Sequence, residues 1–478
     1  MLQQFVAGRW RASAGGGMVE DLNPSDARDV VARVPSGSPQ DVAAAAAAAA
    51  EALPGWQKLS GPTRAEHLFR WSAAIAARQE ELAQAMAREV GKPITEARGE
   101  VARCVAILRY YAGEAVREIG KVIPSQLPAT LQFTLRQPLG VVALITPWNF
   151  PLAIPLWKAA PALAFGNTVV WKPAETASHM ATLLAETSAQ AELPAGVFNV
   201  VLGSGSVIGE PLIGHEAVRA VSFTGSSLTG ARVASAAASR NIRYQTEMGG
   251  KNVAIVLSDA NLDQAAALIA AGAMRYAGQK CTATSRAVVD RKVLDGLLAR
   301  LRTATEELPL APVTDPKAAI GPMISREARD SVARALTEAP FRRVCGGAPP
   351  EDEALARGNF LRPAIVAEVA ADSALAQEEL FGPVLAVLTA ESLEEAIALA
   401  NRSRYGLSAS LFTRDLGSAL TYIPRIEAGL VRVNGDTTGV DPHAPFGGFK
   451  GSSSGSREQG PAAREFYTEI KTVQVSGA

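Results

Sequence analysis

Short runs of apolar residues, each followed by a segment of helical length, constrain the fold of this chain more than any other feature. In the first half of the chain such runs lie at residues 141–145, 168–171, 197–201 and 220–223. The same alternation returns at residues 253–257, 286–289, 384–388 and 430–434. Strands that are apolar on both faces are typical of a parallel sheet that helices cover on both sides. The sequence therefore predicts an α/β fold with two such units.

The segment before the first unit predicts helices. Asp41 can cap the alanine run at residues 43–50, and alanine is the strongest helix former. Apolar residues recur at spacings of three and four over residues 64–90 and 94–115, which predicts two further helices. We therefore expect the first 115 residues to be mostly helical.

Two segments with period-two alternation complete the domain prediction. Residues 120–138 predict a hairpin, and residues 465–475 predict a strand that pairs outside its own domain. At 478 residues the chain is too long for one ordinary core. The expected parts are a Rossmann-like domain at 1–118 and 140–247, a second α/β domain at 248–450, and a small β oligomerisation element at 119–139 and 451–478.

Charge and hydropathy exclude several kinds of partner. Lys plus Arg and Asp plus Glu each number 47, so no net charge attracts the chain to nucleic acid or to an anionic membrane. The chain has neither a signal segment nor about 18 consecutive apolar residues, so secretion and membrane spanning are not expected. A small molecule is the expected partner.

The cysteines and histidines are few and scattered. Cys104, Cys281 and Cys345 form no closely spaced pair, which argues against disulfides and favours a reducing cytoplasm. The four histidines are too far apart in the chain to predict a metal site, so we expect no metal. Cys104 and Cys345 are interpreted as structural residues.

Three polar residues are candidates for chemistry. Cys281 lies among polar neighbours after a predicted helix, Glu247 precedes a glycine pair, and Asn149 lies between two prolines at a strand end. These types can supply a nucleophile, a general base and an oxyanion donor. Each also has an ordinary interpretation, as a buried thiol, a capping carboxylate and a turn residue respectively.

Residues at the ends of predicted strands suggest a dinucleotide site. Lys172 and Glu175 follow one strand, where a glutamate can accept the ribose hydroxyls and would favour NAD over NADP. Glycine-containing turns follow the next two strands, and their N–H groups can face a phosphate. Their candidate residues are Gly205, Gly209, Phe223, Thr224, Gly225 and Ser226. A surface ion pair and plain turns are the alternatives.

Seven motifs in this order resemble the aldehyde dehydrogenase superfamily along essentially the whole chain. They are Pro147-Trp148-Asn149-Phe150-Pro151, Lys172-Pro173-Ala174-Glu175, Phe223-Thr224-Gly225-Ser226, Glu247-Met248-Gly249-Gly250-Lys251, Gly278-Gln279-Lys280-Cys281, Glu378-Glu379-Leu380-Phe381-Gly382-Pro383 and Pro445-Phe446-Gly447-Gly448. The resemblance implies an aldehyde substrate, NAD as cofactor with NADP as the alternative, and a homodimer or homotetramer.

The resemblance also implies a role for each matched residue. Cys281 would be the nucleophile, Glu247 the general base, and Asn149 with the Cys281 N–H the oxyanion hole. Lys172 is counted with this catalytic set and, with Glu175, would hold the adenosine ribose. The remaining cofactor residues would be Ile145, Thr146, Pro147, Trp148, the 223–226 turn, Glu379 and Phe381.

A finer resemblance concerns the substrate. Residues 278–286, 439–443 and 457–460 are similar to the 2,5-dioxopentanoate (α-ketoglutarate semialdehyde) dehydrogenases. Arg275 would then bind a distal carboxylate, with a surface ion pair as its alternative. Expected walls of the substrate tunnel are Phe150, Trp157, Val440 and Phe446, which could equally belong to the core.

Three other functions stay open at this point. The chain could oxidise succinate semialdehyde or another small aldehyde. It could be a CoA-acylating enzyme, although Glu247 argues against this because a thiol acceptor needs no general base. It could also be a cofactor-binding or structural protein that has lost activity, although candidates stand at every catalytic position.

Overall fold

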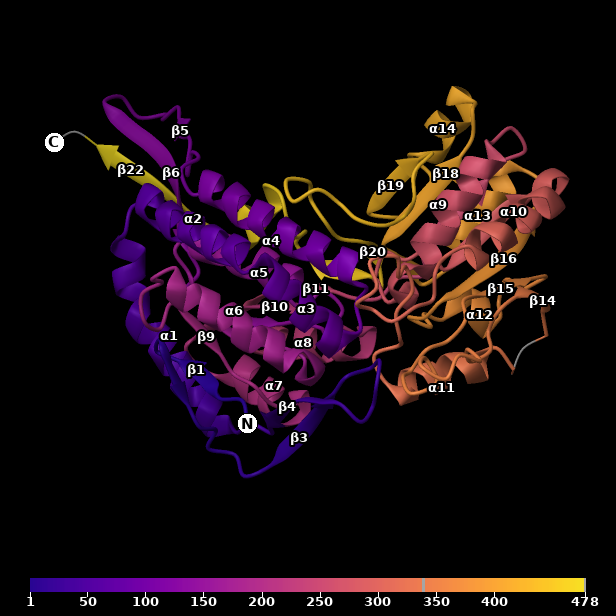
Figure 1. The fold of residues 1–478 in the computed structure, drawn as a ribbon. Helices are drawn as coiled ribbons and strands as arrows, with labels where there is room; N and C mark the ends of the chain where they lie inside the picture. Colours follow the sequence, from indigo (N-terminus) through magenta and orange to yellow (C-terminus); the bar gives the residue numbers. More distant parts are fainter. Residues whose placement is uncertain (338–339, 477–478) are drawn as a thin grey trace.

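The computed structural model describes residues 1–337 and 340–476, most of which form two open sheets flanked by helices (Figure 1). The first sheet has the strand order β2-β1-β9-β8-β7-β10-β11-β21. Its strands are β1 (Gln4–Val6), β2 (Arg9–Arg11), β7 (Val141–Ile145), β8 (Thr168–Lys172), β9 (Phe198–Val200), β10 (Val218–Thr224), β11 (Arg243–Glu247) and β21 (Ser453–Gly455). From β9 to β11 neighbouring strands are parallel. The doubly apolar runs predicted this for β7, β8, β9 and β10, whereas β11 was not predicted.

The order of these parallel strands creates a crevice at one edge. The chain runs outward from β7 through β8 to β9 and then returns to place β10 on the other side of β7. Such a reversal is the point at which open α/β sheets bind ligands, beyond the carboxyl ends of the strands. In the register, Ile145 is paired with both Lys172 and Phe223, and Thr224 is paired with Glu247.

Helices cover both faces of the first sheet. α1, α7 and α8 pack on one face, and α5 and α6 on the other, where α2, α3 and α4 form a further layer. Their bounds are Pro39–Lys58 (α1), Gly61–Ala77 (α2), Gln79–Val90 (α3), Ile94–Glu114 (α4), Ala153–Ala164 (α5), Ser178–Gln190 (α6), Gly205–Gly214 (α7) and Ser227–Ser239 (α8), with a short 3-10 turn η1 at Glu175–Ala177. Among the described residues no helix is long and apolar enough to cross a bilayer.

The second sheet has seven strands in the order β14-β15-β16-β13-β12-β18-β19, of which only β14 is antiparallel to its neighbour. The strands are β12 (Val253–Val256), β13 (Arg286–Asp290), β14 (Arg342–Cys345), β15 (Ala364–Ala367), β16 (Val384–Ala390), β18 (Ser408–Phe412) and β19 (Leu430–Val433). The helices and 3-10 turns are α9 (Leu262–Met274), η2 (Arg275–Gly278), η3 (Arg291–Val293), α10 (Leu294–Glu306), α11 (Arg326–Ala335), α12 (Ala374–Gln377), α13 (Leu393–Asn401) and α14 (Leu416–Tyr422). This sheet has its own apolar core.

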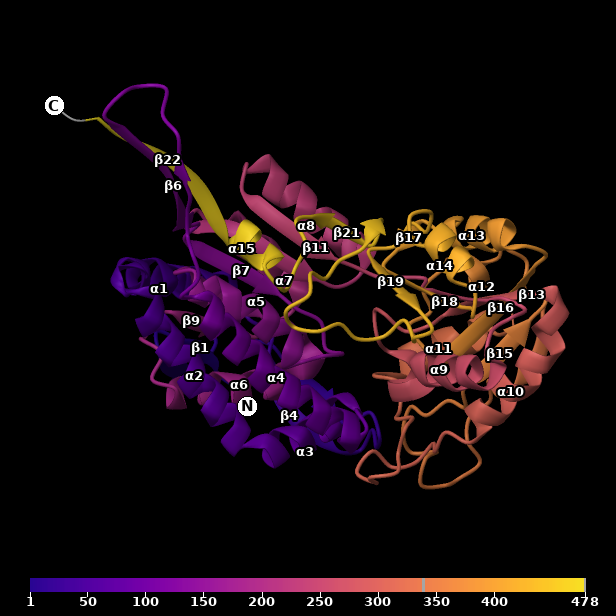
Figure 2. The same ribbon diagram turned by 90° about the horizontal axis from the view of Figure 1, so that it is seen from above.

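The predicted hairpin and tail form a third sheet, β22-β6-β5, that projects from the body (Figure 2). Its strands are β5 (Val122–Ile123), β6 (Thr130–Pro138) and β22 (Thr468–Ser476). β22 pairs with β6 along its whole length, from Thr468 opposite Pro138 to Ser476 opposite Thr130. Small two-stranded sheets are formed by β3 (Met18–Leu22) with β4 (Val30–Pro35) and by β17 (Tyr405–Gly406) with β20 (Phe449–Lys450).

The domain limits remain a prediction, but the strand pairing changes the assignment of residues 451–467. β21 pairs with β11 in the first sheet, and α15 (Ala462–Tyr467) packs on α5. Of the described elements in residues 451–478, only β22 therefore belongs to the projecting sheet. Residues 477–478 lie outside the described residues.

One expectation for the N-terminal segment was wrong, and the other, that its first 115 residues are mostly helical, was confirmed. The single helix over residues 64–90 is two helices, because Arg78 leaves the helical conformation at φ −109° and ψ 21°. Its guanidinium binds Glu81 and Glu186, which fixes the bend against α6. The first 35 residues also form β1 to β4, whereas helices do dominate from Pro39 to Glu114.

Candidate functional site

Cys281 lies just after a tight turn at the end of α9. Tyr276, Ala277 and Gly278 have φ of 56°, 52° and 66°, so three consecutive residues are left-handed. Such a conformation is costly for residues with a side chain and persists only where the surroundings impose it. Here Tyr276 is fully buried, and a Cβ on Gly278 would lie 2.4 Å from the carbonyl oxygen of Gly382.

Two buried amides hold the turn that presents the thiol. Asn252 donates from Nδ2 to the carbonyl oxygens of Cys281 and Ala283, both at 2.8 Å. Gln279 donates to the carbonyl oxygen of Pro322 at 3.0 Å and accepts from the N–H of Ile324 at 2.8 Å. The position of Cys281 is therefore set by the interior of the second domain.

The thiol of Cys281 is partly buried and lies near carboxylates. Burial, followed by the charges of Glu379 and Glu247, raises the pKa of Cys281 to about 12, while the N–H groups of Thr282 and of Cys281 itself lower it. Cys281 packs against an apolar cluster of Leu407, Leu430 and Phe446 that borders this polar region. Without a bound ligand the sulfur is thus a protonated thiol at neutral pH.

Glu247 is the last residue of β11 and is almost completely buried. One carboxyl oxygen accepts a 2.5 Å hydrogen bond from Ser453 of β21. The other oxygen, Oε1, is buried and has no hydrogen-bond partner among the described residues. Desolvation and the nearby charge of Glu458 raise the pKa of Glu247 well above its ordinary value. A carboxyl group with a raised pKa can exchange a proton near neutral pH, as a general base must.

A buried charged network next to Glu247 was not anticipated from the sequence. Lys158 of α5 forms an ion pair with Glu458, and both side chains are almost fully buried. Glu458 also accepts from Trp157 Nε1 at 2.8 Å and from Ser222 at 3.1 Å. The one local signal was Lys158 in an otherwise apolar helical segment. Its partner Glu458 lies in a polar segment 300 positions away, so nothing in the sequence links the two.

Asn149 lies beside the Cys281 turn. Its Nδ2 donates to the carbonyl oxygen of Gln279 at 3.1 Å, which uses one of its two hydrogens. Its backbone carbonyl accepts from Lys92 at 2.7 Å, and Lys92 is paired with Glu100. The Asn149 side chain is therefore held against Gln279, two positions before Cys281. The second hydrogen on Nδ2 is available to a ligand.

Lys172 and its neighbours form the predicted adenosine side of the crevice. Lys172 is buried at the end of β8, and desolvation lowers its pKa to about 8 although Glu175 opposes this. A Cβ on Gly205, at the start of α7, would lie 3.7 Å from Cε of Lys172. Gly209 lies one turn further along α7, so the structure brings Lys172 and Gly205 together at a helix N-terminus.

The turn between β10 and α8 lies next to these residues. Ser226 caps α8 and accepts from the N–H of Thr229 at 3.4 Å. The Phe223 ring fills the space that a Cβ on Gly225 would need, at 2.6 Å, and the buried hydroxyl of Thr224 has no partner within the described part of the chain. Ile145 ends the adjacent strand β7, and Thr146, which follows it, accepts from Trp171 Nε1 at 2.8 Å.

Glu379 and Phe381 reach the same crevice from the second domain. Glu379 accepts from the N–H of Gly250 at 3.0 Å, and burial raises its pKa to about 7. A Cβ on Gly249 would lie 2.0 Å from Oε2 of Glu379, which shows why the glycine pair is needed there. Phe381, which has a φ of 50°, packs edge-on against Trp148.

Four of the five predicted substrate residues lie around the thiol or the residues that flank it. Val440 and Phe446 pack in the cluster with Cys281, and Trp157 packs on Phe446 with ring centroids 5.7 Å apart. The Phe150 ring faces Lys92 at 4.0 Å. Arg275 is exposed, and its side chain makes neither a hydrogen bond nor an ion pair with any described residue.

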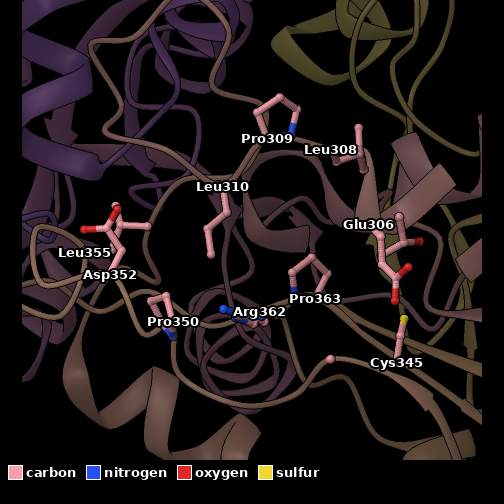
Figure 3. A pocket seen from close by; sticks show the side chains of 12 residues that line it. Glu306, Leu308, Pro309, Leu310, Cys345, Pro350, Asp352, Leu355, Arg362 and Pro363 are labelled. Atoms are coloured by element: carbon pink, nitrogen blue, oxygen red, sulfur yellow. The ribbon is translucent and has the colours of Figure 1, made fainter. Parts of the chain in front are cut away.

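The structure also contains a hollow of about 480 Å³ remote from these residues (Figure 3). Its lining includes Glu306, Cys345, Asp352 and Arg362, and none of the predicted site residues. Cys345, interpreted from the sequence as structural, is only partly buried there, whereas Cys104 is fully buried. The candidate site is thus defined by convergence of side chains at the sheet edge and not by this hollow.

The first sheet has the kind of edge that binds dinucleotides, and a constrained thiol and a buried carboxyl group lie beside it. This combination indicates an oxidoreductase. Residues 10–473 match the model of the aldehyde dehydrogenase family, and the chain belongs to that family. It is 46% identical over 98% of its length to the alpha-ketoglutaric semialdehyde dehydrogenase of Bacillus subtilis, covering 97% of that protein. It is 42% identical to the alpha-ketoglutarate semialdehyde dehydrogenase of Haloferax volcanii, with 98% of each chain covered.

Solved structures agree with the sequence comparisons. The crystal structure of betaine aldehyde dehydrogenase from Staphylococcus aureus in complex with NAD⁺ matches with a TM-score of 0.96 at 32% identity. The match covers 99% of this chain and 94% of the other. The predicted aldehyde dehydrogenase fold and family are therefore confirmed.

Proposed function

We propose that this protein oxidises 2,5-dioxopentanoate to 2-oxoglutarate with NAD⁺, through a thioester on Cys281. The observation that carries the proposal is the convergence of Cys281, Glu247 and Asn149 at the carboxyl edge of the first sheet. The similarity to two α-ketoglutarate semialdehyde dehydrogenases over nearly the whole chain supports the substrate.

The first half of the reaction is addition of the thiolate to the aldehyde carbon. The new C–S bond moves the carbonyl electron pair to oxygen, where Asn149 Nδ2 and the N–H of Cys281 can donate hydrogen bonds. Because the pKa of Cys281 is about 12, a base must take its proton, and Glu247 is the buried carboxylate near it. Loss of hydride from the former aldehyde carbon then leaves a thioester on Cys281.

The second half of the reaction is hydrolysis of that thioester. Glu247 first passes the proton it took from Cys281 to solvent and then accepts a proton from a water molecule. The resulting hydroxide attacks the acyl carbon, the C–S bond breaks, and the carboxylic acid and the Cys281 thiolate are released. The Lys158–Glu458 pair lies behind Glu247, and the charge of Glu458 helps to keep the pKa of Glu247 raised. Raised basicity suits a group that must deprotonate water.

The residues at the sheet edge fit a bound dinucleotide. Lys172 and Glu175 can hold the adenosine ribose, and the N-termini of α7 and α8 can face the pyrophosphate. Gly205 leaves room beside Lys172 where a side chain would intrude, and Glu379 with Phe381 can position the nicotinamide end. When bound, the nicotinamide supplies the hydride acceptor. Glu175 favours NAD over NADP because it would repel a 2′-phosphate.

The test is oxidation of 2,5-dioxopentanoate, with each nicotinamide in turn, by the wild type and two variants. Cys281→Ala should abolish cofactor reduction. Glu247→Gln should form at most one equivalent of reduced cofactor per site, more slowly than the wild type because the thiol has lost its base, and then stop because the thioester is not hydrolysed. Cys345→Ser is the matched control and should retain turnover. The proposal fails if Cys281→Ala turns over, or if wild-type turnover requires CoA, as expected of an acylating enzyme.

We also propose that the projecting sheet mediates a homodimer or homotetramer. Val122, Leu131, Ile470 and Val475 on its strands are 76%, 51%, 61% and 53% exposed. Exposed apolar side chains gathered on one element are typical of an interface. We further propose a cytoplasmic location, where a reducing environment keeps the Cys281 thiol free.

A further inference from the structure

Arg103 of α4 reaches the surroundings of Cys281 from the first domain. Its Nη2 donates to the carbonyl oxygen of Val440, 337 residues further along the chain. Val440 packs with Cys281 against the Phe446 cluster, and the Cys281 thiol is among the groups that act on the charge of Arg103. The guanidinium therefore lies at the border of the apolar surroundings of the thiol.

Within the described residues this guanidinium has no ion-pair partner. Its Nε is buried without a hydrogen bond, and burial lowers the pKa of Arg103. Glu100 is close, but it already forms an ion pair with Lys92. The side chain of Asp441 is also close, but it is 77% exposed to solvent.

An unpaired, partly buried guanidinium is unfavourable unless an anion binds to it. Removing the charge from water costs free energy that a neutral carbonyl acceptor offsets only in part. A carboxylate can accept two parallel hydrogen bonds from a guanidinium, which is the strongest pairing open to arginine. Because Arg103 lies beside the Cys281 cluster, a carboxylate that pairs with it would be one that the substrate carries.

Arg275 offers a weaker site for the same group. Its side chain is exposed, and a fully hydrated arginine contributes little to the binding of an anion. Arg103 is more strongly desolvated and is held in place by Val440. The difference in burial favours Arg103.

We propose that Arg103 is a specificity-determining residue that binds the distal carboxylate of a short ω-carboxylated aldehyde. The inference rests on the proposed oxidation at Cys281 and specifies the substrate class of that site. The carboxylate would bind the N–H groups that the described residues leave unpaired, while the aldehyde carbon lies at the sulfur.

The experiment compares kcat/KM for 2,5-dioxopentanoate with kcat/KM for pentanal, a neutral aldehyde with the same number of carbons. Arg103→Gln should lower this ratio by about 100-fold, mainly through KM, as expected when a buried charge pair loses one partner. Arg103→Lys keeps the positive charge but loses the two parallel N–H donors of the guanidinium, so it should give an intermediate ratio. Arg109→Gln, on the same helix but bound to Ser72, is the matched control and should keep the wild-type ratio.

Several outcomes would overturn the inference. An unchanged ratio in Arg103→Gln would do so, as would equal losses for both aldehydes, which would indicate only a structural tie to Val440. A lowered ratio in Arg275→Gln alone would assign the carboxylate to Arg275. If Arg103→Gln does not fold, an Arg103→Lys enzyme with the wild-type ratio and KM overturns it. A wild type that oxidises neither aldehyde refutes the proposed function, whereas one that oxidises both without preference refutes only Arg103.

Discussion

Ser453 donates a 2.5 Å hydrogen bond to Glu247 across the antiparallel pairing of β21 with β11, from 206 residues away in the chain. This bond lowers the pKa of Glu247, against the larger effects of burial and of Glu458. A C-terminal strand thus adjusts the basicity of a residue that ends a strand of the first domain.

Ser453→Ala should therefore raise the pKa of Glu247 further. Hydrolysis needs the carboxylate form, so the acidic limb of the pH profile of kcat should move to higher pH by about 0.5 to 1 unit. Steady-state rates between pH 6 and 10 test this shift. Ser454→Ala, which removes a hydroxyl bonded to Thr246, is the matched control and should leave the limb in place. A shift to lower pH would contradict the assignment.

Alkylation of Cys281 should be slow at neutral pH. Because the pKa of Cys281 is about 12, the rate with iodoacetamide should rise about tenfold per pH unit, without a plateau below pH 10. In Glu379→Gln the rate should be higher above about pH 7, where Glu379 is charged in the wild type, because one carboxylate that raises the pKa of Cys281 is gone. A Cys104→Ala/Cys345→Ser background isolates the signal, which mass spectrometry follows. A plateau near pH 8 would refute the buried, protonated thiol.

Two glycines near the site should respond differently to alanine. In Gly278→Ala the Cβ would meet backbone oxygens at 2.4 and 2.8 Å at a φ of 66°, so we expect a loss of about 3 kcal/mol or more of unfolding free energy. In Gly249→Ala the Cβ would meet the movable carboxyl group of Glu379, so the fold should persist while the KM for the cofactor rises. Thermal melts and cofactor titrations separate the two, and equal losses of stability would contradict this distinction.

Charge on the projecting sheet should disrupt assembly. Ile470 is 61% exposed on β22, and Ile470→Asp would bury a charge in any interface that covers this position. We expect a smaller oligomer by light scattering after size exclusion. Ile470→Val keeps an apolar side chain at this position and should assemble like the wild type. Unchanged mass for Ile470→Asp would locate the interface elsewhere.

Local sequence patterns were sufficient for most of the architecture. The doubly apolar runs predicted most of the parallel strands of both sheets but missed β11, β15 and β18. The alternation over 120–138 and 465–475 predicted the projecting sheet. The break at Arg78 was missed because no glycine or proline marks it, and the bend depends on Glu186 of α6. The strands β1 to β4 were missed because they are short and their burial follows no simple alternation.

The sequence by itself determined which residues are candidates for chemistry, because a thiol, a carboxylate, an amide and strand-end glycines are recognisable wherever they stand in a chain. Only the tertiary structure decided what surrounds each one: the Ser453 bond and Glu458 charge on Glu247, the left-handed turn before Cys281, and the unpaired charge of Arg103 at Val440. These properties arise between residues hundreds of positions apart. Desolvation and hydrogen bonding, which set pKa and affinity, depend on distance in space and leave no local pattern in the sequence.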